Sequence, residues 1–560
     1  MSILNLISFI GIFGLCAVAW LFSENRNPKY FPWRVVIWGI LLQLILGFLV
    51  FAFPITQIFL QWFTDLLNVI FDAADAGARF VFGNRLVPIP GQEPLVLSPL
   101  PASGACAPPR PGEVLPGLCG IQLGYIFAFR ALPAVIFFSG LMALLYNLGL
   151  IQIVTNFFAK IFYRAMRLSG AESLSGAANI FVGIEAAIVV KPFLASMTRS
   201  ELLAILACCF GTAASSTLAI YVSFLKPVFP NILGHLVSAS VMAIPACFVL
   251  SKILLPETTV PVTAGGIPDE RSLDQALNEE VEDFEAGVAR TAPVHQETVA
   301  GEPIERVSPL DAAIVGALDG VKMAVAIAAV LILILGLVYL INQFFGALTL
   351  LPFGIGEIFK VVTLQNILGA LFLPLTVLTG VSLDWSELWA SSVIIGRRLF
   401  ETAIPPYQSL AAASRDGVLS DRALLIVSYA LSGFAHLASV GIFVGGTTAL
   451  IPSRRKDISE LGWKALFVGT LATMMIACIA GVFDTGNSSI LGSPEEVAPQ
   501  TAPAAPTATP SPAALPAVSP AVSPAVSPAA PPAAPANTAP PAAPPASPDA
   551  VPVTPAPATP

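Results

Sequence analysis

The sequence predicts an all-α polytopic membrane protein whose two halves carry related, interrupted segments. Of its 560 residues, 56% are hydrophobic and 11% are charged, whereas soluble domains carry about 25% charged residues. Apolar segments of helical length recur from the N-terminus to Phe483, and roughly 20 such residues make a spanning helix. The phrase EAAI, which contains Glu185, returns in the other half of the chain as ETAI, which contains Glu401.

Eight segments have the length and polarity of spanning helices. A membrane β-barrel is excluded, because its strands would be shorter and would alternate in polarity. The first segment lacks a basic leader and a cleavage site, so we interpret it as a helix and not as a signal peptide. The predicted spans lie near 4–22, 35–66, 123–149, 201–225, 231–255, 311–342, 421–450 and 461–483.

Two further apolar regions, 168–198 and 360–413, are too broken by Gly, Pro and charge to be ordinary spans. Each contains one of the two acidic phrases. A carboxylate at membrane depth costs roughly 2.5–3.5 kcal/mol on insertion scales, so two of them in matching contexts indicate a buried site. Paired discontinuous segments of this kind are typical of the binding sites of secondary transporters.

Basic residues predict the orientation of the chain. Clusters at 26–34, 160–167 and 454–456 fall on one side of the membrane if the N-terminus is outside. We therefore expect a multi-pass protein of a bacterial inner membrane with its N- and C-termini outside.

Composition divides the chain into five parts. The tail is nearly all Ala, Pro, Ser, Thr and Val, a composition that cannot build a core. The parts are 1–122, the N-terminal helices and a periplasmic loop; 123–255, a first transport repeat; 256–310, an acidic cytoplasmic linker; 311–483, a second transport repeat; and 484–560, a disordered tail.

Seven cysteines are present, and five of them lie in apolar segments, where we expect them to be packing residues. Cys106 and Cys119 instead flank a Pro-rich stretch of the periplasmic loop. A disulfide between them and two free thiols are both open, because sequence alone does not supply the geometry.

Five longer stretches carry a more specific signal. They are LPAVIFFSGLMALLYNLGL (132–150), GAESLSGAANIFVG (170–183), KPFLASMTRSELLAI (191–205), SYALSGFAHLASVGI (428–442) and KALFVGTLATMMIACIAGVF (464–483). Together they resemble the concentrative nucleoside transporters, from Leu132 to Phe483 with gaps over the acidic linker.

The resemblance implies a fold of about eight transmembrane helices plus two re-entrant hairpins in an inverted repeat, assembled as a homotrimer. Hairpin one would span about 170–198 and hairpin two about 385–413, each followed by a helix that unwinds near mid-membrane. The implied activity is secondary active uptake of nucleosides driven by a cation gradient. The expected partners are a nucleoside and the lipid bilayer, without an enzymatic activity, a cofactor or a nucleic acid.

The resemblance also carries solute-binding roles onto positions of this chain. In hairpin one, GIEAA stands where the family has GQTEAP and is one residue shorter. In hairpin two, FETAIPPY stands where the family has NEFVAY, which displaces the glutamate by two positions. In the next helix, FAHLAS replaces FANFSS. The expected solute-binding residues are Gly183, Ile184, Glu185, Glu401, Phe434, His436 and Ser439.

A sodium site in the family uses hairpin one and the helix that follows it. The matching positions here are Asn179, Val182, Thr212 and Ala213, and no metal other than a sodium ion is implied. His436 replaces an asparagine, and an imidazole has an unperturbed pKa of about 6.5. Because of this histidine and the shortened hairpin tip, we favour a proton over sodium as the coupling ion.

The chemistry of these residues suits a neutral sugar-bearing solute. Carboxylates accept charge-assisted hydrogen bonds from a ribose diol, so Glu185 and Glu401 could hold the sugar from opposite hairpins, with Phe434 against the ring faces. Plainer interpretations remain open. Either glutamate could form a structural ion pair with Lys191, Arg397 or Arg398, or carry a proton; His436 and Phe434 could pack only; Asn179 could cap a helix; and Thr212 could bond back to its own helix.

Other functions are weaker. A gated pore would show continuous polar faces, which the spans lack. A membrane enzyme that uses Glu185, Glu401 and His436 as an acid–base or zinc set has no supporting HExxH or Cys/His spacing. The same fold with a different sugar-bearing solute is the main alternative.

Overall fold

The structure is a computed structural model, and its contacts define one compact unit over Met1–Ala498. Cys106 lies outside the described residues, so whether it forms a disulfide with Cys119 stays open. Most of the acidic linker and of the Ala/Pro-rich tail also lie outside the described residues and stay predictions. The described residues are 2–53, 69–70, 72–83, 86–87, 95–99, 118–122, 126–181, 183–213, 215–266, 297–299, 302–304, 308–349, 359 and 361–486.

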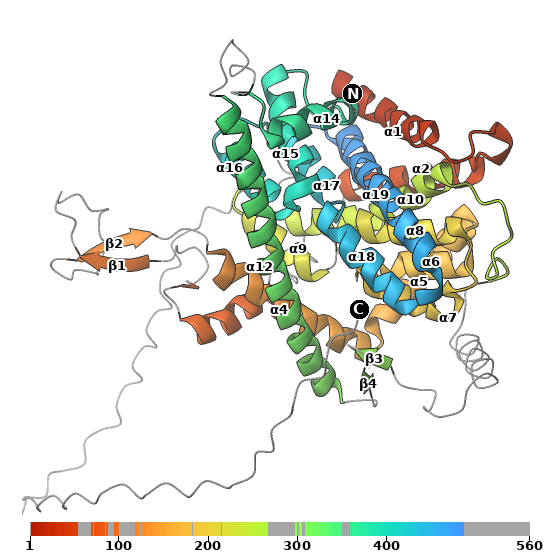
Figure 1. The fold of residues 1–560 in the computed structure, drawn as a ribbon, viewed down its shortest axis with the longest axis horizontal. Helices are drawn as coiled ribbons and strands as arrows, with labels where there is room; N and C mark the ends of the chain where they lie inside the picture. The colour runs from red at the N-terminus through yellow and green to blue at the C-terminus, as the bar shows by residue number, and fades with distance from the viewer. Residues whose placement is uncertain are drawn as a thin grey trace, which may run out of the picture. The chain divides into compact units, whose positions relative to one another are not determined.

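The described residues are mostly helical, as predicted (Figure 1). The N-terminal half contains α1 (Ile3–Leu21), η1 (Pro28–Tyr30), α2 (Trp33–Phe51), α4 (Phe127–Asn147), α5 (Leu150–Met166), α6 (Gly170–Ala178), η2 (Ile184–Val190), α7 (Lys191–Leu194), α8 (Arg199–Gly211), α9 (Ser215–Leu225) and α10 (Ile232–Leu254). The C-terminal half contains α12 (Pro309–Leu348), α14 (Leu364–Thr379), α15 (Trp385–Glu401), α16 (Ile404–Arg415), α17 (Asp421–Leu431), α18 (Leu437–Leu450), η3 (Pro452–Arg454) and α19 (Arg455–Phe483).

In the part of the chain that the structure describes, the strands form two short antiparallel pairs within predicted loops. β1 (Leu95–Pro99) pairs with β2 (Leu118–Gln122), and β3 (Glu297–Val299) pairs with β4 (Glu302–Ile304). The second pair lies within the acidic linker.

Six helices of the described chain are long and apolar enough to cross a membrane, namely α1, α2, α4, α10, α12 and η3 with α19. They coincide with six of the eight predicted spans. The span predicted over 35–66 was too long, since α2 ends at Phe51. Pro54 follows in the sequence, and a proline disfavours the helical conformation of the residue before it. The amphipathic helix α5 was not predicted.

The other two predicted spans are each a pair of half-helices. α8 and α9 are separated at 212–214, and α17 and α18 at 432–436. With a rise of about 1.5 Å per residue, the 11 residues of α17 reach ~16 Å, or about half of a ~30 Å hydrocarbon core. The chain therefore leaves the helical path near the middle of the bundle in both places.

The order of elements repeats along the chain. A helical hairpin, a broken helix and a long helix appear first as α6 with η2 and α7, then α8 and α9, then α10. They appear again as α15 with α16, then α17 and α18, then α19, while α14 is a separate helix before the second hairpin. The long helices α10 and α19 pack on each other, and α8 packs on both (Figure 1).

The chain ends of the helical body meet at one end of the bundle. The Asn5 side-chain amide donates to the Val482 carbonyl at 3.0 Å. The Arg422 guanidinium bridges the Asp484 carboxylate at 2.8 Å and the Gly380 carbonyl at 3.0 Å. The start of α1, the end of α19, the start of α17 and the end of α14 thus lie together, beside the open end of the second hairpin.

The open end of the first hairpin lies at the opposite end of the bundle. Arg199, at the start of α8, bridges Glu460 of α19 at 2.9 Å. The Glu24 amide donates to the Leu254 carbonyl at 2.9 Å, and Arg454 donates to the Met197 carbonyl at 2.9 Å. The two hairpins therefore open toward opposite ends, which agrees with the inverted repeat that the family resemblance implied. Which end faces the outside stays a prediction.

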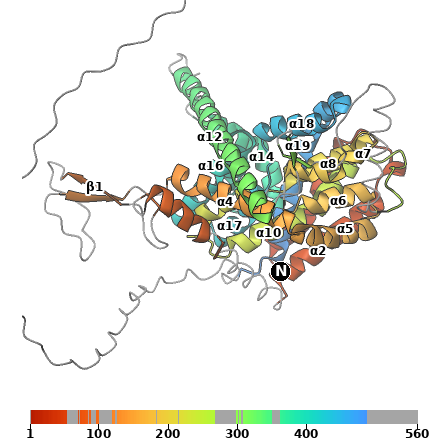
Figure 2. The ribbon, with the colours of Figure 1, turned by 90° about the horizontal axis from the view of Figure 1, so that it is seen from below.

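Helix α12 packs along α4 through small residues (Figure 2). A Cβ atom built on Gly316 would lie 2.8 Å from the Ser139 carbonyl oxygen, and one built on Gly320 would lie 2.8 Å from Ile136 Cα. Such small residues allow the close backbone approach typical of membrane helices. Away from this contact α12 is exposed and apolar, with Ile332 77% and Phe344 63% exposed.

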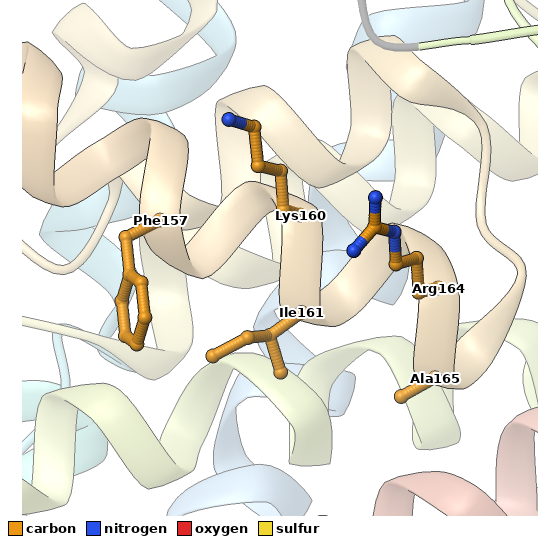
Figure 3. Close-up of a pocket in the computed structure, with 5 residues that line it drawn as sticks. All are labelled: Phe157, Lys160, Ile161, Arg164 and Ala165. Carbon is orange, nitrogen blue, oxygen red and sulfur yellow. The ribbon is translucent and has the colours of Figure 1, made fainter.

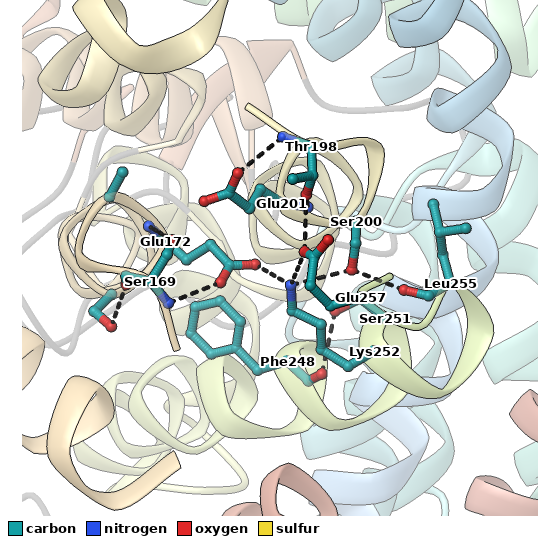
Figure 4. Close-up of polar contacts among 12 residues, drawn as sticks. Ser169, Glu172, Thr198, Ser200, Glu201, Phe248, Ser251, Lys252, Leu255 and Glu257 are labelled. Carbon is teal, nitrogen blue, oxygen red and sulfur yellow. Dashed lines mark hydrogen bonds and ion pairs between the residues drawn. The ribbon is translucent and has the colours of Figure 1, made fainter. Parts of the chain in front are cut away.

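A buried network of charges fixes the first hairpin to α10 (Figure 4). Glu172 is the third residue of α6 and forms a capping box with Ser169. The Lys252 ammonium of α10 contacts the Glu172 carboxylate at 2.5 Å, the Ser200 hydroxyl at 3.1 Å and the Glu257 carboxylate at 3.3 Å. Lys252 is 5% exposed and Glu172 1%, so these charges depend on one another.

Lys252→Met is expected to destabilise the protein strongly, because it leaves the buried Glu172 carboxylate without its counterion. Breaking a buried pair costs roughly 3–5 kcal/mol. The matched control is Lys464→Met, which removes more exposed pairs to Glu24 and Glu460, each worth about 1 kcal/mol or less. Thermal unfolding of the two variants in detergent checks the order, and equal losses of melting temperature would contradict it.

Candidate functional site

The two helix breaks meet in the interior of the bundle. The Phe434 amide of the second break donates to the Thr212 carbonyl of the first break at 3.2 Å. Gly433 permits this approach, since a Cβ atom there would lie 2.7 Å from the Gly211 carbonyl oxygen. One amide and one carbonyl freed by the breaks are thus paired with each other, and irregular backbone at membrane depth is tolerated where it is satisfied within the protein.

The predicted cation residues surround the first break and the turn of the first hairpin. Asn179 is fully buried, and its side-chain amide donates to the Ser175 carbonyl at 3.2 Å. Its Oδ1 atom has no hydrogen-bond partner among the described residues. The Thr212 hydroxyl donates to the Cys208 carbonyl of its own helix at 2.8 Å. Ala213 is fully buried, and Val182 lies outside the described residues.

The turn of the first hairpin lies against α8. The Cys209 sulfur is 3.9 Å from the buried Gly183 carbonyl oxygen. Across the hairpin, the Ser175 hydroxyl donates to the Ala186 carbonyl at 3.1 Å. Ile184 and Glu185 begin η2, but their side chains lie outside what the structure describes, so the expected meeting of Glu185 with Glu401 stays a prediction.

Glu401 is the last residue of α15, at the tip of the second hairpin, and is 1% exposed. Arg397, one turn earlier, contacts its Oε2 atom at 2.7 Å. The Gln365 side-chain amide of α14 donates to its Oε1 atom at 3.0 Å. The ion pair that the sequence left open as an alternative is therefore formed. Gln365 was not predicted, although an amide in an apolar helix is a signal that could have found it.

The residue after Glu401 has a strained backbone. Thr402 has φ +67° and ψ −176°, a region that is essentially reserved for glycine and costs roughly 1–3 kcal/mol. It is 7% exposed, and its hydroxyl lies 3.4 Å from the Ile404 amide that donates to it. This strain makes the tip of the second hairpin a sharp corner between α15 and α16.

The second break presents an aromatic ring beside a polar pair. Phe434 is half-buried between buried neighbours, and its ring centroid is 5.9 Å from that of His436, at an interplanar angle of 85°. His436 is the N-cap of α18, where its ring accepts from the Ser439 amide at 3.3 Å and contacts the Ser439 hydroxyl at 3.0 Å. The structure thus brings together the three predicted solute residues of this break.

Three family descriptions match the chain. "Na+ dependent nucleoside transporter C-terminus" matches residues 235–481, "Na+ dependent nucleoside transporter N-terminus" matches 10–85, and "Nucleoside recognition" matches 128–228. An uncharacterized transporter of Haemophilus influenzae is 32% identical over 489 residues, 86% of this chain and 98% of the relative. The chain belongs to the concentrative nucleoside transporter family.

A further relative and a solved structure agree with this assignment. Solute carrier family 28 member 3 of Mus musculus is 31% identical, over 85% of this chain and 59% of that longer protein. The structure of the transporter CNTnw in an inward-facing substrate-bound state has a TM-score of 0.68 and 31% identity, and it covers 88% of this chain and all of that one. Concentrative nucleoside transporters are cation-coupled carriers and not enzymes, so the family excludes the membrane-enzyme alternative.

A surface hollow on α5 is separate from these residues. It has a volume of about 470 Å³ and is lined by Phe157, Lys160, Ile161, Arg164 and Ala165 (Figure 3). All five come from one helix, so the hollow is a groove on the surface of that helix. In this concentrative nucleoside transporter the candidate site is instead the interior contact of the two breaks with the two hairpin tips.

Gly433→Ala is expected to abolish most transport and to lower the melting temperature, because the added methyl group would clash with the Gly211 carbonyl and push the two breaks apart. The matched control is Gly441→Ala in α18, where a Cβ atom would meet nothing within 4 Å. Solute uptake and thermal stability of both variants check this. Normal uptake by Gly433→Ala would contradict the importance of the contact.

Proposed function

We propose that this protein accumulates nucleosides by coupling their uptake to a cation that binds beside the first helix break. One observation carries the proposal: the breaks of α8/α9 and α17/α18 meet at a 3.2 Å main-chain hydrogen bond within a chain of this family. Transporters place solute and ion sites where discontinuous helices of two repeats come together. A pore would not need two such facing breaks.

We propose that the two helical hairpins are re-entrant and belong to an inverted repeat. Their support is the repeated order of elements and the opening of the hairpins at opposite ends of the bundle. Movement of one hairpin would then expose the breaks to one side of the membrane, and movement of the other hairpin to the other side. This arrangement gives alternating access to a site at fixed depth.

We assign the solute site by resemblance together with position in the fold. Glu401 and Glu185 would accept hydrogen bonds from ribose hydroxyls, and Phe434 would pack against the rings. Gly183, Ile184, His436 and Ser439 complete the assignment. In the structure Glu401 Oε1 accepts from the Gln365 amide, and Oε2 accepts from both Nε and Nη2 of Arg397. A carboxylate oxygen can accept about two hydrogen bonds, so Oε1 is the oxygen with room for a ribose hydroxyl. The same pocket with another sugar-bearing solute is the alternative.

We propose sodium as the coupling ion, in place of the proton favoured by the sequence. Two observations support the change. Asn179 offers a buried side-chain oxygen without a partner among the described residues, and oxygens suit hard cations. His436 uses its ring to cap α18, which accounts for this histidine without a proton-carrying role. The family descriptions also name sodium.

We propose a homotrimer in a bacterial inner membrane, with both ends of the helical body outside. Its support is the exposed apolar surface of α12, which needs lipid or another copy of the chain to cover it, and the one-sided placement of the basic clusters.

Reconstitution into proteoliposomes tests the function. A sodium gradient at constant pH is compared with a pH gradient in the absence of sodium, and labelled uridine, cytidine, adenosine and inosine are supplied in turn. We expect saturable accumulation above equilibrium under the sodium gradient only. Accumulation under the pH gradient alone would return the coupling role to a proton, and equilibration without accumulation would indicate a pore.

Asn179→Ala is expected to raise the sodium concentration for half-maximal uptake by about 10-fold or more. The reason is that losing one oxygen ligand of the ion should cost about as much as losing a hydrogen bond to a charged group. Asn366→Ala, at the start of α14, is the matched control, since its side chain bonds only to the Val361 carbonyl. Sodium titrations of uptake check this, and an unchanged titration would remove Asn179 from the ion site.

Glu401→Gln is expected to weaken nucleoside binding by about 10- to 100-fold, because a charge-assisted hydrogen bond is worth roughly 1.5–3 kcal/mol. Glu387→Gln makes the same change at the other end of α15, where the side chain accepts from the Ser420 amide. Binding to purified protein and melting temperature are measured together. A lower melting temperature with unchanged affinity would mean that Glu401 serves only the ion pair with Arg397.

A further inference from the structure

The second hairpin buries a positive charge that the proposed site does not use. Arg398, in α15, is 1% exposed and is the largest fully buried side chain in the described part of the chain. Its neighbour Arg397 is paired with Glu401. No carboxylate of the described residues lies within ion-pair distance of Arg398. Burying a charge in this way costs several kcal/mol unless other groups compensate it.

One edge of the Arg398 guanidinium is bonded and another is open. Its Nη1 atom donates to the Ala430 carbonyl at the end of α17. Its Nε and Nη2 atoms are buried and have no hydrogen-bond partner among the described residues. In a planar guanidinium the Nε–H and Nη2–H groups project side by side from one edge. This edge is the fork with which arginine donates two parallel hydrogen bonds.

The surroundings of Arg398 are aromatic and belong to the candidate site. Its charge interacts with Tyr221 of α9 and Tyr407 of α16, whose rings stack with centroids 4.5 Å apart. Both tyrosines are almost completely buried, and the Tyr407 hydroxyl donates to the Ser428 carbonyl at 2.8 Å. The charge of Arg398 also acts on His436. The guanidinium therefore lies where the second hairpin, α9 and the second break come together.

The hairpin tips offer few other donors to a solute. The tip of the first hairpin reads GIEAAI, in which Glu185 is the one polar side chain. Carboxylates accept hydrogen bonds and do not donate them when ionised. They suit hydroxyl groups, but they cannot bond to the ring nitrogen and carbonyl acceptors of a base. A donor for these acceptors must come from elsewhere in the site.

We propose that Arg398 reads the base of the transported nucleoside, by donating Nε–H and Nη2–H to two adjacent acceptors in one plane. This inference rests on the proposed nucleoside transport. Guanosine and inosine present such a pair at O6 and N7, the edge that arginine reads in nucleic acids. Cytidine presents one at O2 and N3. Adenosine and uridine present no adjacent pair of acceptors. In uridine the N3–H donor lies between O2 and O4, and in adenosine the N6 amino donor stands beside N7. The preferred substrates are therefore 6-oxopurine nucleosides and cytidine.

The Nε and Nη2 edge of Arg398 is buried away from solvent. A nucleoside therefore reaches it only when the second hairpin moves away from α9 and α17. The stacked pair Tyr221 and Tyr407 joins these elements. Separation of the two rings would expose the Nε and Nη2 edge of Arg398 and place an aromatic face beside the incoming base.

Matched nucleoside pairs test the proposal in proteoliposomes. The ratio of kcat/KM for cytidine over uridine, and for inosine over adenosine, is measured for the unmodified protein and for Arg398→Lys. The unmodified protein is expected to prefer the first member of each pair by about 5- to 150-fold, the equivalent of 1–3 kcal/mol for a bidentate contact. Lysine keeps the charge and loses the fork, so both ratios should fall toward one while uridine uptake continues.

Arg415→Lys, on an exposed part of the same hairpin, is the control and should leave both ratios unchanged. Arg398→Gln provides a second variant, and melting temperatures check that the variants fold. If neither variant folds, the ratios measured for the unmodified protein decide whether the proposal holds. Nucleoside uptake without these preferences, or an equal loss for all nucleosides in Arg398→Lys, would overturn the role of Arg398 and leave transport intact. Absence of any nucleoside uptake would instead overturn the proposed function.

Discussion

The rest of the architecture depends on one main-chain contact, the hydrogen bond from the Phe434 amide to the Thr212 carbonyl. A helix that ends inside a membrane exposes backbone groups that water cannot reach, and each one left unsatisfied is costly. Here two helices break beside each other, and the second break supplies an amide donor to a carbonyl of the first. Gly433 makes the contact possible, because any side chain there would strike the Gly211 carbonyl. The broken helices therefore stabilise each other as a pair.

The buried charges described next are paired with opposite charges, except for Arg398. Lys252 neutralises Glu172 near the open end of the first hairpin, and Arg397 neutralises Glu401 at the tip of the second. The first pair holds its hairpin to α10, whereas the second lies within α15 and is joined to α14 through Gln365. Arg398 departs from this pattern, with one edge bonded to the carbonyl of a helix C-terminus and another edge open. The negative end of the α17 dipole eases its burial, and the open edge gives the second hairpin a role in recognition.

Much of this fold could be predicted from the sequence. The apolar segments predicted α1, α4, α10, α12 and α19 because a bilayer imposes a length and a composition on each span. The two interrupted regions, 168–198 and 360–413, contain both hairpins, and the opposite directions of the hairpins followed from the inverted repeat that the family resemblance implied. The helix break at Thr212 and the one at Phe434 followed from the family resemblance. Their direct contact did not, because it depends on three-dimensional packing at Gly433.

The site was less accessible to sequence reasoning. Ion pairing of Glu401 was one of several open interpretations, and only the helical phase of α15 shows that Arg397 reaches it. Gln365 and the strained Thr402 carry no periodic or compositional signal. Arg398 was considered only as a counterion for a glutamate, since a sequence shows a charge but not which of its edges is bonded. Helix α5 was missed because its basic residues interrupt an apolar stretch that is too short to span a membrane.

The central claim is that the transported solute binds where the two breaks meet. Ala438 is half-exposed in the first turn of α18, close in sequence to Phe434 and His436. The five cysteines whose side chains the structure describes are buried. The most direct measurement is the rate at which a small maleimide labels Ala438→Cys, with and without saturating nucleoside. The account predicts that nucleoside slows this labelling and leaves the labelling of an exposed Ser196→Cys unchanged. Labelling of Ala438→Cys at the same rate in the presence of a nucleoside that the protein transports would contradict it.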